Sequence, residues 1–364
     1  MNVPIVSKLP PARLSFRKTP LFPGTKAVLT TNGRTAISLG LKTLSMPAGA
    51  VVLMPDWHCG SEIDAVISAG GRPVLYPLDQ ALNADLDALS ALVQQHQPWA
   101  IYCIHYFGYP QPLSELAGLA KRHGAVLIED LALGLLSQGG TSPIGRTGDM
   151  TIYSLVKTLA VPDGGALWLR DKPVANRLKA QSVLSSLRGA RRMVRRLKPV
   201  RGMLTDKFAT TPEAALDAWD QRAGFTKGRP LLAASGLSAT LCTHMPLADI
   251  RAAHRQNYQK LWLALVAADA APRARPLLPE LPLEACPAYF PALVSDPADA
   301  TAALAAAGIE SVLFWRRFLP DFGPEIGDRP VHLKRHVLRL PIHPAIDASA
   351  LSRMVAALVG PKAK

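Results

Sequence analysis

Strand-like and helix-like patterns alternate without interruption between Val51 and Asp130. Apolar runs bounded by turn residues predict strands at 51–56, 72–78, 99–107 and 125–130, and amphipathic runs predict helices at 61–70, 85–96 and 112–124. Strands that alternate with helices of this length form βαβ units. We therefore expect an α/β fold whose mostly parallel sheet is sandwiched by helices. Right-handed crossovers would place the carboxyl ends of the strands at one edge.

The stretch Gly124–Leu169 carries the polar residues that this edge would bring together. The strand ending at Asp130 has a second acid, Glu129, beside it. A further apolar run, 150–155, includes Ser154 and is followed by Lys157. The sequence Pro-Asp-Gly-Gly at 162–165 predicts a sharp turn into another strand. Ligands of open α/β sheets bind at the carboxyl ends of strands, so Asp130 and Lys157 are expected to face one crevice.

A lysine and an aspartate in one water-poor crevice suit pyridoxal phosphate. Desolvation makes an ammonium lose its proton more easily, and the free amine can form a Schiff base with an aldehyde. A buried carboxylate needs a partner, which the protonated ring nitrogen of this cofactor supplies. An ordinary buried ion pair explains the same two residues, so their spacing alone leaves both interpretations open.

Two further segments are candidates for the same edge. The loops Asp56–Cys59 and His105–Gly108 follow predicted strands and contain aromatic side chains, which pack in the core or form a platform for a cofactor. The turn Thr31–Gly33 opens a helical pattern. Free backbone N–H groups at such a helix start favour a phosphate, although a simple N-capped helix explains the same pattern.

The remaining sequence predicts three regions. Residues 1–29 are rich in proline and form an N-terminal arm, 30–245 form the large domain, and 246–364 form a smaller C-terminal α+β domain. The smaller domain is expected to contain a strand at 289–294 and a closing helix at 348–359.

The formal net charge of +14 is concentrated in one helical segment, 180–207, where arginines between Arg188 and Arg201 recur at helical spacing. A solvated surface helix and a contact with an anionic membrane or a polyphosphate ligand both explain this face. Nucleic acid is not expected as a partner, because no aromatic residues interleave with the basic ones.

The cysteines and the apolar runs limit the cellular context. The four cysteines are scattered and none stands at metal-ligand spacing, so no metal site is expected and the thiols are expected to be reduced. No apolar run approaches the roughly 20 residues of a membrane-spanning helix. The N-terminus lacks the apolar core of a secretory signal. We therefore expect a cytoplasmic protein.

Five fragments, in order, resemble the DegT/DnrJ/StrS-type aminotransferases, which transfer amino groups to nucleotide-linked keto-sugars. The resemblance extends from about Thr30 to the C-terminus and is carried by TNGRTAISLGL, VVLMPDWHCGSEIDAVISAGGRPVLYPLD, IHYFGYPQPLSELAGLAKRHGAVLIEDLA, GDMTIYSLVKTLAVPDGGALWL and LRLPIHPAID. It implies the large domain of fold-type I pyridoxal-phosphate enzymes, and it implies pyridoxal 5'-phosphate as the cofactor.

The resemblance also implies roles for individual residues. Lys157 would be the Schiff-base lysine, and Asp130 the partner of the ring nitrogen. The backbone of Gly33 and Arg34, together with Ser154, would hold the phosphate. Cys59 falls where the family usually has an aromatic residue that stacks on the ring, so Trp57 or His58 is expected to take that role. Further departures from the family pattern are Leu133, Cys242 and the arginine-rich segment.

The function implied is transfer of an amino group, with glutamate as the expected donor, to a keto-sugar in cell-surface polysaccharide or secondary-metabolite biosynthesis. The resemblance also implies a homodimer. Three alternatives stay open: a non-catalytic regulator with the same fold, a membrane-associated protein, and a divergent aminotransferase acting on a keto compound other than a sugar.

Overall fold

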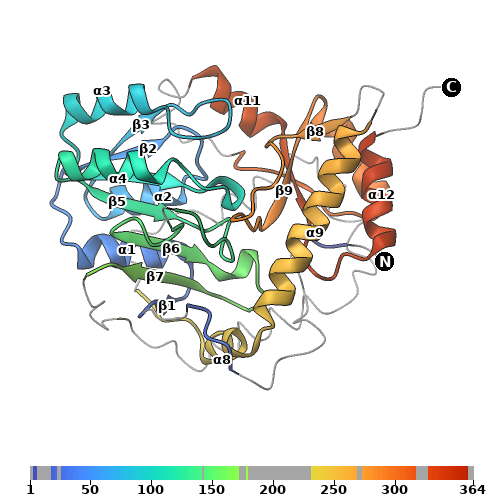
Figure 1. Cartoon of the computed structure of the whole chain (residues 1–364), viewed down its shortest axis with the longest axis horizontal. Helices are drawn as coiled ribbons and strands as arrows, with labels where there is room; N and C mark the ends of the chain where they lie inside the picture. Colours follow the sequence, from blue (N-terminus) through green and yellow to red (C-terminus); the bar gives the residue numbers. More distant parts are fainter. Residues whose placement is uncertain are drawn as a thin grey trace.

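The computed structural model describes residues 3–5, 18–22, 26–141, 143–171, 178, 231–268, 273–316 and 327–359. Their strands form two sheets (Figure 1). The predicted basic segment 180–207, with Arg188–Arg201, lies outside the described residues.

The larger sheet has the strand order β1-β7-β6-β5-β4-β2-β3. Its strands are β1 (Val28–Thr30), β2 (Val51–Pro55), β3 (Arg72–Tyr76), β4 (Ala100–Ile104), β5 (Val126–Asp130), β6 (Met150–Ser154) and β7 (Gly165–Leu169). Strands β2 to β6 run parallel to one another, whereas β7 is antiparallel to both β6 and β1. The prediction of a mostly parallel sheet is therefore confirmed.

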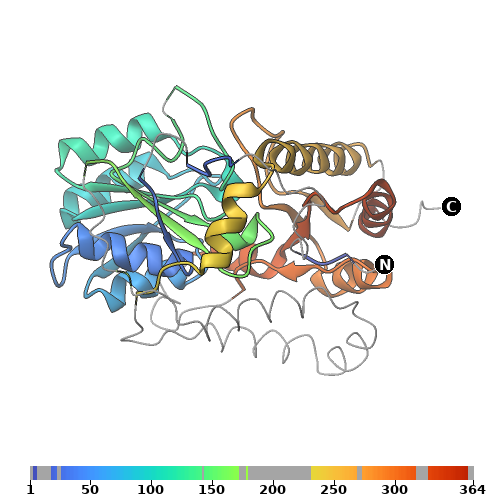
Figure 2. The same ribbon diagram turned by 90° about the horizontal axis from the view of Figure 1, so that it is seen from below.

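Helices cover both faces of this sheet (Figure 2). One apolar core contains side chains of α1 (Gly33–Thr43) and α2 (Ser61–Ser68). The opposite core contains side chains of α3 (Leu86–His96), α4 (Leu113–Arg122) and α8 (Gly236–His244). Because both faces are covered, the central strands are mostly apolar, and this is why they could be recognised in the sequence.

Two details differ from the sequence-based expectations. The strand expected at 99–107 ends at Ile104, because Phe107 and Gly108 have left-handed φ angles of 53° and 76° and form the short helix η1 (Tyr106–Gly108). Helix α8 was not predicted. The side-chain oxygen of Ser235 caps its first turn by accepting a hydrogen bond from Ser238 N.

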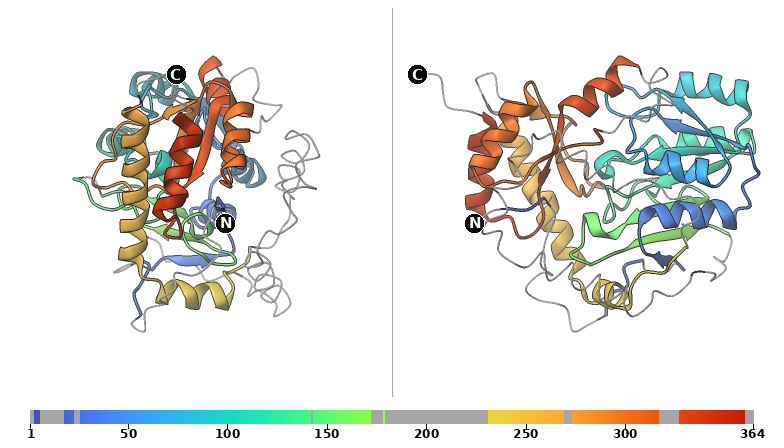
Figure 3. Two further views of the ribbon diagram at one scale, coloured as in Figure 1. Left: turned by 90° about the vertical axis from the view of Figure 1, so that its right-hand side faces the viewer. Right: turned by 180° about the vertical axis from the view of Figure 1, so that it is seen from behind.

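The second sheet is antiparallel and has the order β10-β11-β9-β8. Its elements are α9 (Leu247–Val266), β8 (Ala274–Pro276), β9 (Tyr289–Val294), α10 (Pro297–Ala306), β10 (Val312–Leu313), α11 (Asp328–His336), β11 (Val337–Pro341) and α12 (Ala348–Val359). Helices α9, in gold, and α12, in red, pack against each other beside this sheet (Figure 3). The strand expected at 289–294 and the helix expected at 348–359 coincide with β9 and α12.

The N-terminal residues contact the part of the chain that forms the second sheet. Val3 N donates to Gly308 O at 2.7 Å, and Glu310 N donates to Val3 O at 2.9 Å. The expected end of the arm at residue 29 falls inside β1, which belongs to the larger sheet. We propose to keep the division between residues 245 and 246, because the described strands before it form the larger sheet and those after it form the second sheet.

Candidate active site

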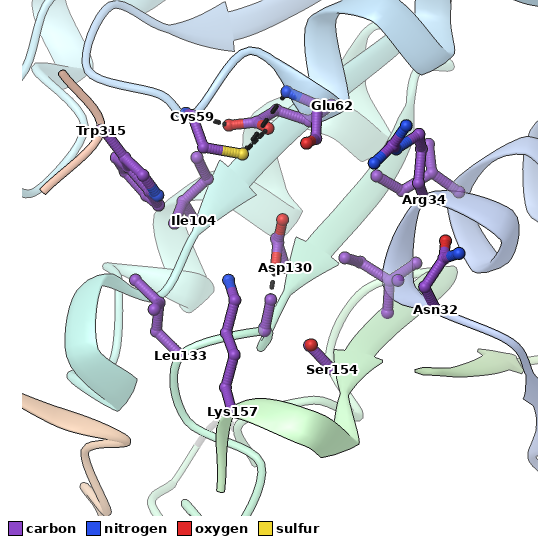
Figure 4. A pocket seen from close by; sticks show the side chains of 15 residues that line it. Asn32, Arg34, Cys59, Glu62, Ile104, Asp130, Leu133, Ser154, Lys157 and Trp315 are labelled. Carbon is purple, nitrogen blue, oxygen red and sulfur yellow. Dashed lines mark hydrogen bonds between the residues drawn. The ribbon is translucent and has the colours of Figure 1, made fainter. Parts of the chain in front are cut away.

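A pocket of about 210 Å³ lies at the carboxyl ends of β4, β5 and β6. Side chains from the starts of α1 and α2, and one from beyond β10, complete its wall (Figure 4). The lining residues are Asn32, Gly33, Arg34, Ile37, Cys59, Ser61, Glu62, Ile104, Asp130, Ala132, Leu133, Ile152, Ser154, Lys157 and Trp315.

Lys157 and Asp130 line this pocket together, and both end groups point into it (Figure 4). Asp130 is the last residue of β5, and Lys157 ends the short helix η2 (Leu155–Lys157) directly after β6. The two strands are parallel neighbours with Asp130 opposite Ile152. This pairing is what brings together two residues that are distant in sequence.

The Asp130 carboxylate is held by two hydrogen bonds. Tyr102 Oη donates to its Oδ2 at 2.6 Å, and Ala132 N donates to its Oδ1 at 2.8 Å. Burial, assisted by the Glu62 carboxylate, raises the pKa of Asp130 to about 6, although the Tyr102 hydroxyl and Lys157 act in the opposite direction. A cationic group bound beside Asp130 would offset this cost of burying its charge.

The start of α1 forms the end of the pocket that suits an anion. Asn32 caps the helix by accepting a hydrogen bond from Thr35 N at 2.9 Å, and the Gly33 and Arg34 backbone follows at the positive end of the helix dipole. Ser154 lines the pocket beside this turn. The structure thus brings together Gly33, Arg34 and Ser154, the three residues expected to hold a phosphate.

The pocket lining does not include Trp57 or His58, one of which was expected to stack on a cofactor ring. Both are fully buried. The Trp57 ring stacks on Tyr106 at a centroid distance of 5.2 Å. His58 is enclosed without a hydrogen bond to either ring nitrogen, and burial lowers its pKa to about 3. Cys59 lines the pocket instead, and Gly60 with a left-handed φ of 85° follows it at the start of α2.

Cys59 is paired with an acid that the sequence interpretation missed. Its backbone N donates to Glu62 Oε1 at 2.8 Å, and its thiol donates to Glu62 Oε2 at 2.7 Å. Burial and the neighbouring Glu62 carboxylate raise the pKa of the thiol to about 12. An acid in the first turn of the helix after β2 was a signal that could have indicated Glu62.

The other expected loop residues are used for packing. His105 Nε2 lies 3.0 Å from Glu129 Oε2, and both side chains are fully buried. Glu129 also accepts from the backbone N of Gly145 and Gly148. Alternate residues of a strand face opposite sides of a sheet, so Glu129 points away from the face used by Asp130. His105 and Glu129 therefore form a structural pair outside the pocket.

Metal-binding clusters and membrane-spanning helices are both absent from the part of the chain that the structure describes. No cluster of three or more His, Cys, Asp or Glu side chains is arranged to hold a metal ion. Within these same residues, no helix has the length and apolar character that crossing a bilayer requires.

Comparison with known proteins identifies the family of this chain. The sequence profile of the DegT/DnrJ/EryC1/StrS aminotransferase family matches residues 21–221, more than half of the chain. The chain belongs to this family. The resemblance to the DegT/DnrJ/EryC1/StrS family that the sequence fragments indicated is therefore confirmed.

Curated relatives of this DegT/DnrJ/EryC1/StrS family member include two aminotransferases. The dTDP-4-dehydro-2,3,6-trideoxy-D-glucose 4-aminotransferase of Saccharopolyspora spinosa is 28% identical over 42% of the chain and 40% of its own length. A UDP-N-acetyl-3-dehydro-alpha-D-glucosamine 3-aminotransferase of Acidithiobacillus ferrooxidans is 28% identical over 41% of each protein. The chain thus spans less than half the length of these relatives.

A solved structure has a similar fold. A putative sugar aminotransferase from Streptococcus pneumoniae, in its PMP form, superposes with a TM-score of 0.66 at 15% identity and covers 98% of this chain and 96% of its own. The α/β architecture of this family member is therefore that of known aminotransferase structures.

Proposed function

We propose that this chain is a pyridoxal-phosphate-dependent aminotransferase. It moves an amino group from an amino-acid donor, for which we expect glutamate, to a nucleotide-linked keto-sugar in cell-surface polysaccharide or secondary-metabolite biosynthesis. The observation that supports this most is the convergence of Lys157 and Asp130 in one pocket, with an anion-binding helix start beside them. The names of the two curated relatives support the sugar as acceptor.

The pocket residues fit pyridoxal phosphate by their chemistry. Asp130 is a buried acid with a raised pKa, which a cation at the ring nitrogen would stabilise in its ionised form. Backbone N–H groups at Gly33 and Arg34, the Arg34 guanidinium and the Ser154 hydroxyl suit a phosphate group. The cofactor, when bound, supplies an electron sink for the carbanion formed at the substrate Cα.

The protein's own residues then have distinct tasks. Lys157 Nζ would hold the aldehyde carbon at rest and, once displaced by the donor, would take the proton from the donor Cα and deliver it to the former aldehyde carbon. Asp130 would keep a proton on the ring nitrogen, and Tyr102 together with Ala132 N fixes the orientation of its carboxylate. The walls from Ile104, Leu133 and Ile152 limit access of water.

Trapping the lysine adduct tests this function. Protein incubated with pyridoxal phosphate should gain a visible absorption band, and borohydride should fix the cofactor on the peptide that contains Lys157. Glutamate should shift the band before the trapping step. Lys157→Ala should lose both signals, whereas Lys121→Ala, at an exposed position on α4, should keep them. Wild-type protein that stays colourless, or is labelled only elsewhere, would refute the proposal.

Turnover with a defined acceptor tests the substrate class. The two keto compounds named for the relatives, dTDP-4-dehydro-2,3,6-trideoxy-D-glucose and UDP-N-acetyl-3-dehydro-α-D-glucosamine, serve as probes. Amination of either one, with glutamate consumed in equal amount, supports a nucleotide-linked sugar. A glutamate reaction without amination of either compound would favour a keto substrate of another kind.

Three finer points belong to the same proposal. We expect a homodimer, which light scattering on the purified protein measures. We expect the cytoplasm as its compartment, and four free cysteines are compatible with a reducing environment. Contact of Arg188–Arg201 with an anionic membrane stays a prediction from sequence. Salt-sensitive binding to anionic but not to zwitterionic vesicles tests it.

A further inference from the structure

Trp315 lines the pocket although it belongs to the part of the chain that forms the second sheet. It follows β10, and it is the pocket-lining residue that comes from beyond residue 245 within the described ranges. In Figure 4, Trp315 and Arg34 lie at opposite sides of the pocket, with Lys157 and Asp130 between them. The indole therefore lies on the side of Lys157 that faces away from the anion-binding end.

The indole is held in place by other aromatic rings. It stacks on Phe314 at a centroid distance of 4.4 Å and an interplanar angle of 26°. Its ring centroid lies 5.2 Å from that of Trp57 and 5.8 Å from that of Tyr106, and both pairs are packed edge to face. Aromatic contacts of this kind stabilise a side chain by more than the area that they bury. The half-buried Trp315 thus presents a preorganised surface rather than a loose side chain.

The backbone at this residue is in a costly conformation. Trp315 has a φ of 54°, in the left-handed region that a bulky residue rarely adopts. Such positions are unfavourable and persist where the surrounding structure enforces them, often at ligand sites. The strain and the pocket wall are two independent observations on one residue.

The loop after β2 places no aromatic side chain in the pocket wall beside this indole. That loop offers the pocket only the small Cys59 side chain, whose thiol is bound to Glu62, while Trp57 is packed behind it. Apart from Trp315, the described pocket wall carries no aromatic side chain. A substrate ring that enters opposite the anion-binding end therefore meets the indole.

We propose that Trp315 is the specificity-determining residue for the acceptor and that the apolar C–H face of a cyclic keto substrate packs on its indole. The proposal rests on the proposed function and extends it to the shape of the acceptor. Dispersion between the ring carbons and the indole favours a cyclic acceptor over an open-chain keto acid. The donor half of the reaction, which needs no such ring, does not depend on Trp315.

Separating the two half-reactions tests this role. The experiment compares four proteins: wild type, Trp315→Ala, Trp315→Phe and the control Trp262→Phe. Each protein is loaded with pyridoxal phosphate, reacted with glutamate, and then given the two keto-sugars named above. Trp262 is a half-buried tryptophan whose Nε1 donates to Leu278 O at 3.1 Å, away from the pocket. We expect Trp315→Ala to raise the acceptor KM roughly tenfold or more. The phenylalanine variants should stay within about threefold of wild type.

The donor half-reaction and the visible band should change less than about twofold in all variants. A shifted band or weaker cofactor binding in Trp315→Ala, with unchanged acceptor KM, would mean that Trp315 contacts the cofactor and would overturn the proposal. Wild type that reacts with glutamate and 2-oxoglutarate but with neither cyclic ketone would also overturn it. A wild type without the glutamate reaction would refute the proposed function instead.

A binding measurement gives a readout that needs no catalysis. UDP-N-acetylglucosamine, the reduced form of one keto compound, should quench tryptophan fluorescence of wild type and of Trp262→Phe. The quenching should be lost in Trp315→Phe, which retains an aromatic ring at the position and is the variant expected to fold if Trp315→Ala does not. Equal quenching in wild type and Trp315→Phe would contradict a contact between sugar and indole.

Discussion

Asp130 shows how a single residue can cost stability and serve a site. Its folded-state pKa of about 6 lies above the ordinary value of 3.8. Between these values the folded protein binds a proton that the unfolded chain has lost, so the free energy of unfolding falls as the pH rises from about 4 to 6. At neutral pH the cofactor-free protein therefore carries a buried charge that its hydrogen bonds and Lys157 compensate only in part.

We predict that Asp130→Asn stabilises the cofactor-free protein at pH 7.5 by up to about 3 kcal/mol, the value of roughly two pKa units. The amide can still accept from Ala132 N and donate to Tyr102 Oη. Near pH 4 the two proteins should differ little, because Asp130 is then protonated. Urea unfolding at both pH values measures this difference. A variant less stable than wild type at neutral pH would contradict the assigned pKa.

The thiol of Cys59 gives a second prediction for a single residue. With a pKa of about 12 instead of 9.0, its thiolate fraction at pH 8 is roughly a thousandfold lower than that of an ordinary thiol. Alkylation by iodoacetamide, followed by peptide mass spectrometry, should therefore be very slow at Cys59. Burial is the larger cause of this raised pKa and the Glu62 charge adds to it, so Glu62→Gln should accelerate labelling of Cys59 but not of the buried Cys286. Equal rates in both proteins would contradict the Cys59–Glu62 pairing.

At the scale of elements, the start of α1 and the turn before β7 depend on each other. A Cβ at residue 165 would lie within 2.5 Å of Asn32 O and Gly33 N, which are backbone atoms that cannot move aside. Gly165 is therefore required by close approach rather than by its own dihedral angles. The neighbouring Asp163 fixes the same turn to α8 by accepting from Ser235 N at 3.1 Å and from the Ser235 hydroxyl at 3.0 Å.

We predict that Gly165→Ala destabilises the protein by roughly 2 kcal/mol or more and weakens binding of pyridoxal phosphate, because it pushes the anion-binding turn out of place. Gly236→Ala, at the start of α8, is the matched control, since a Cβ there meets no atom within 4 Å. Thermal unfolding and a cofactor titration measure both effects. Wild-type stability in Gly165→Ala would show that the two segments are not in close contact.

The elements also show how far the sequence could predict this molecule. The alternation from Val51 to Asp130 predicted the parallel strands because strands covered on both faces are mostly apolar. Asp130 and Lys157 could be expected in one crevice because the topology of parallel strands requires it. Spacing does not indicate that Cys59 rather than Trp57 lines the pocket, because this depends on the local path of the loop after β2. Trp315 was missed because it reaches the pocket from another sheet.

At the scale of the whole molecule, the N-terminus stabilises the second sheet of its own chain. Val3 and Ile5 are buried, Ile5 N donates to Glu310 Oε2 at 2.9 Å, and a ring nitrogen of His343 lies 2.9 Å from Pro4 O. His343 belongs to the LRLPIHPAID fragment, so part of that family signature has a structural role here. These contacts join the two ends of the sequence.

We predict that removal of residues 2–5 lowers the free energy of unfolding by roughly 3 kcal/mol, since two aliphatic side chains lose their buried positions. The loss should appear in urea unfolding as a lower midpoint. Removal of Asn2 alone, which keeps Val3 and Ile5, is the control. An unchanged midpoint in the longer deletion would mean that the second sheet does not need these residues.

The placement of β1 has a consequence for synthesis of the protein. This early strand has β7 as its partner in the larger sheet, with Thr30 opposite Gly165. Contacts of such sequence separation form late, because a long loop must close before they are made. A ribosome that has not yet released Gly165 therefore carries a nascent chain with no β7 for β1 to join. The phosphate end of the pocket can mature only after most of the first sheet has been translated.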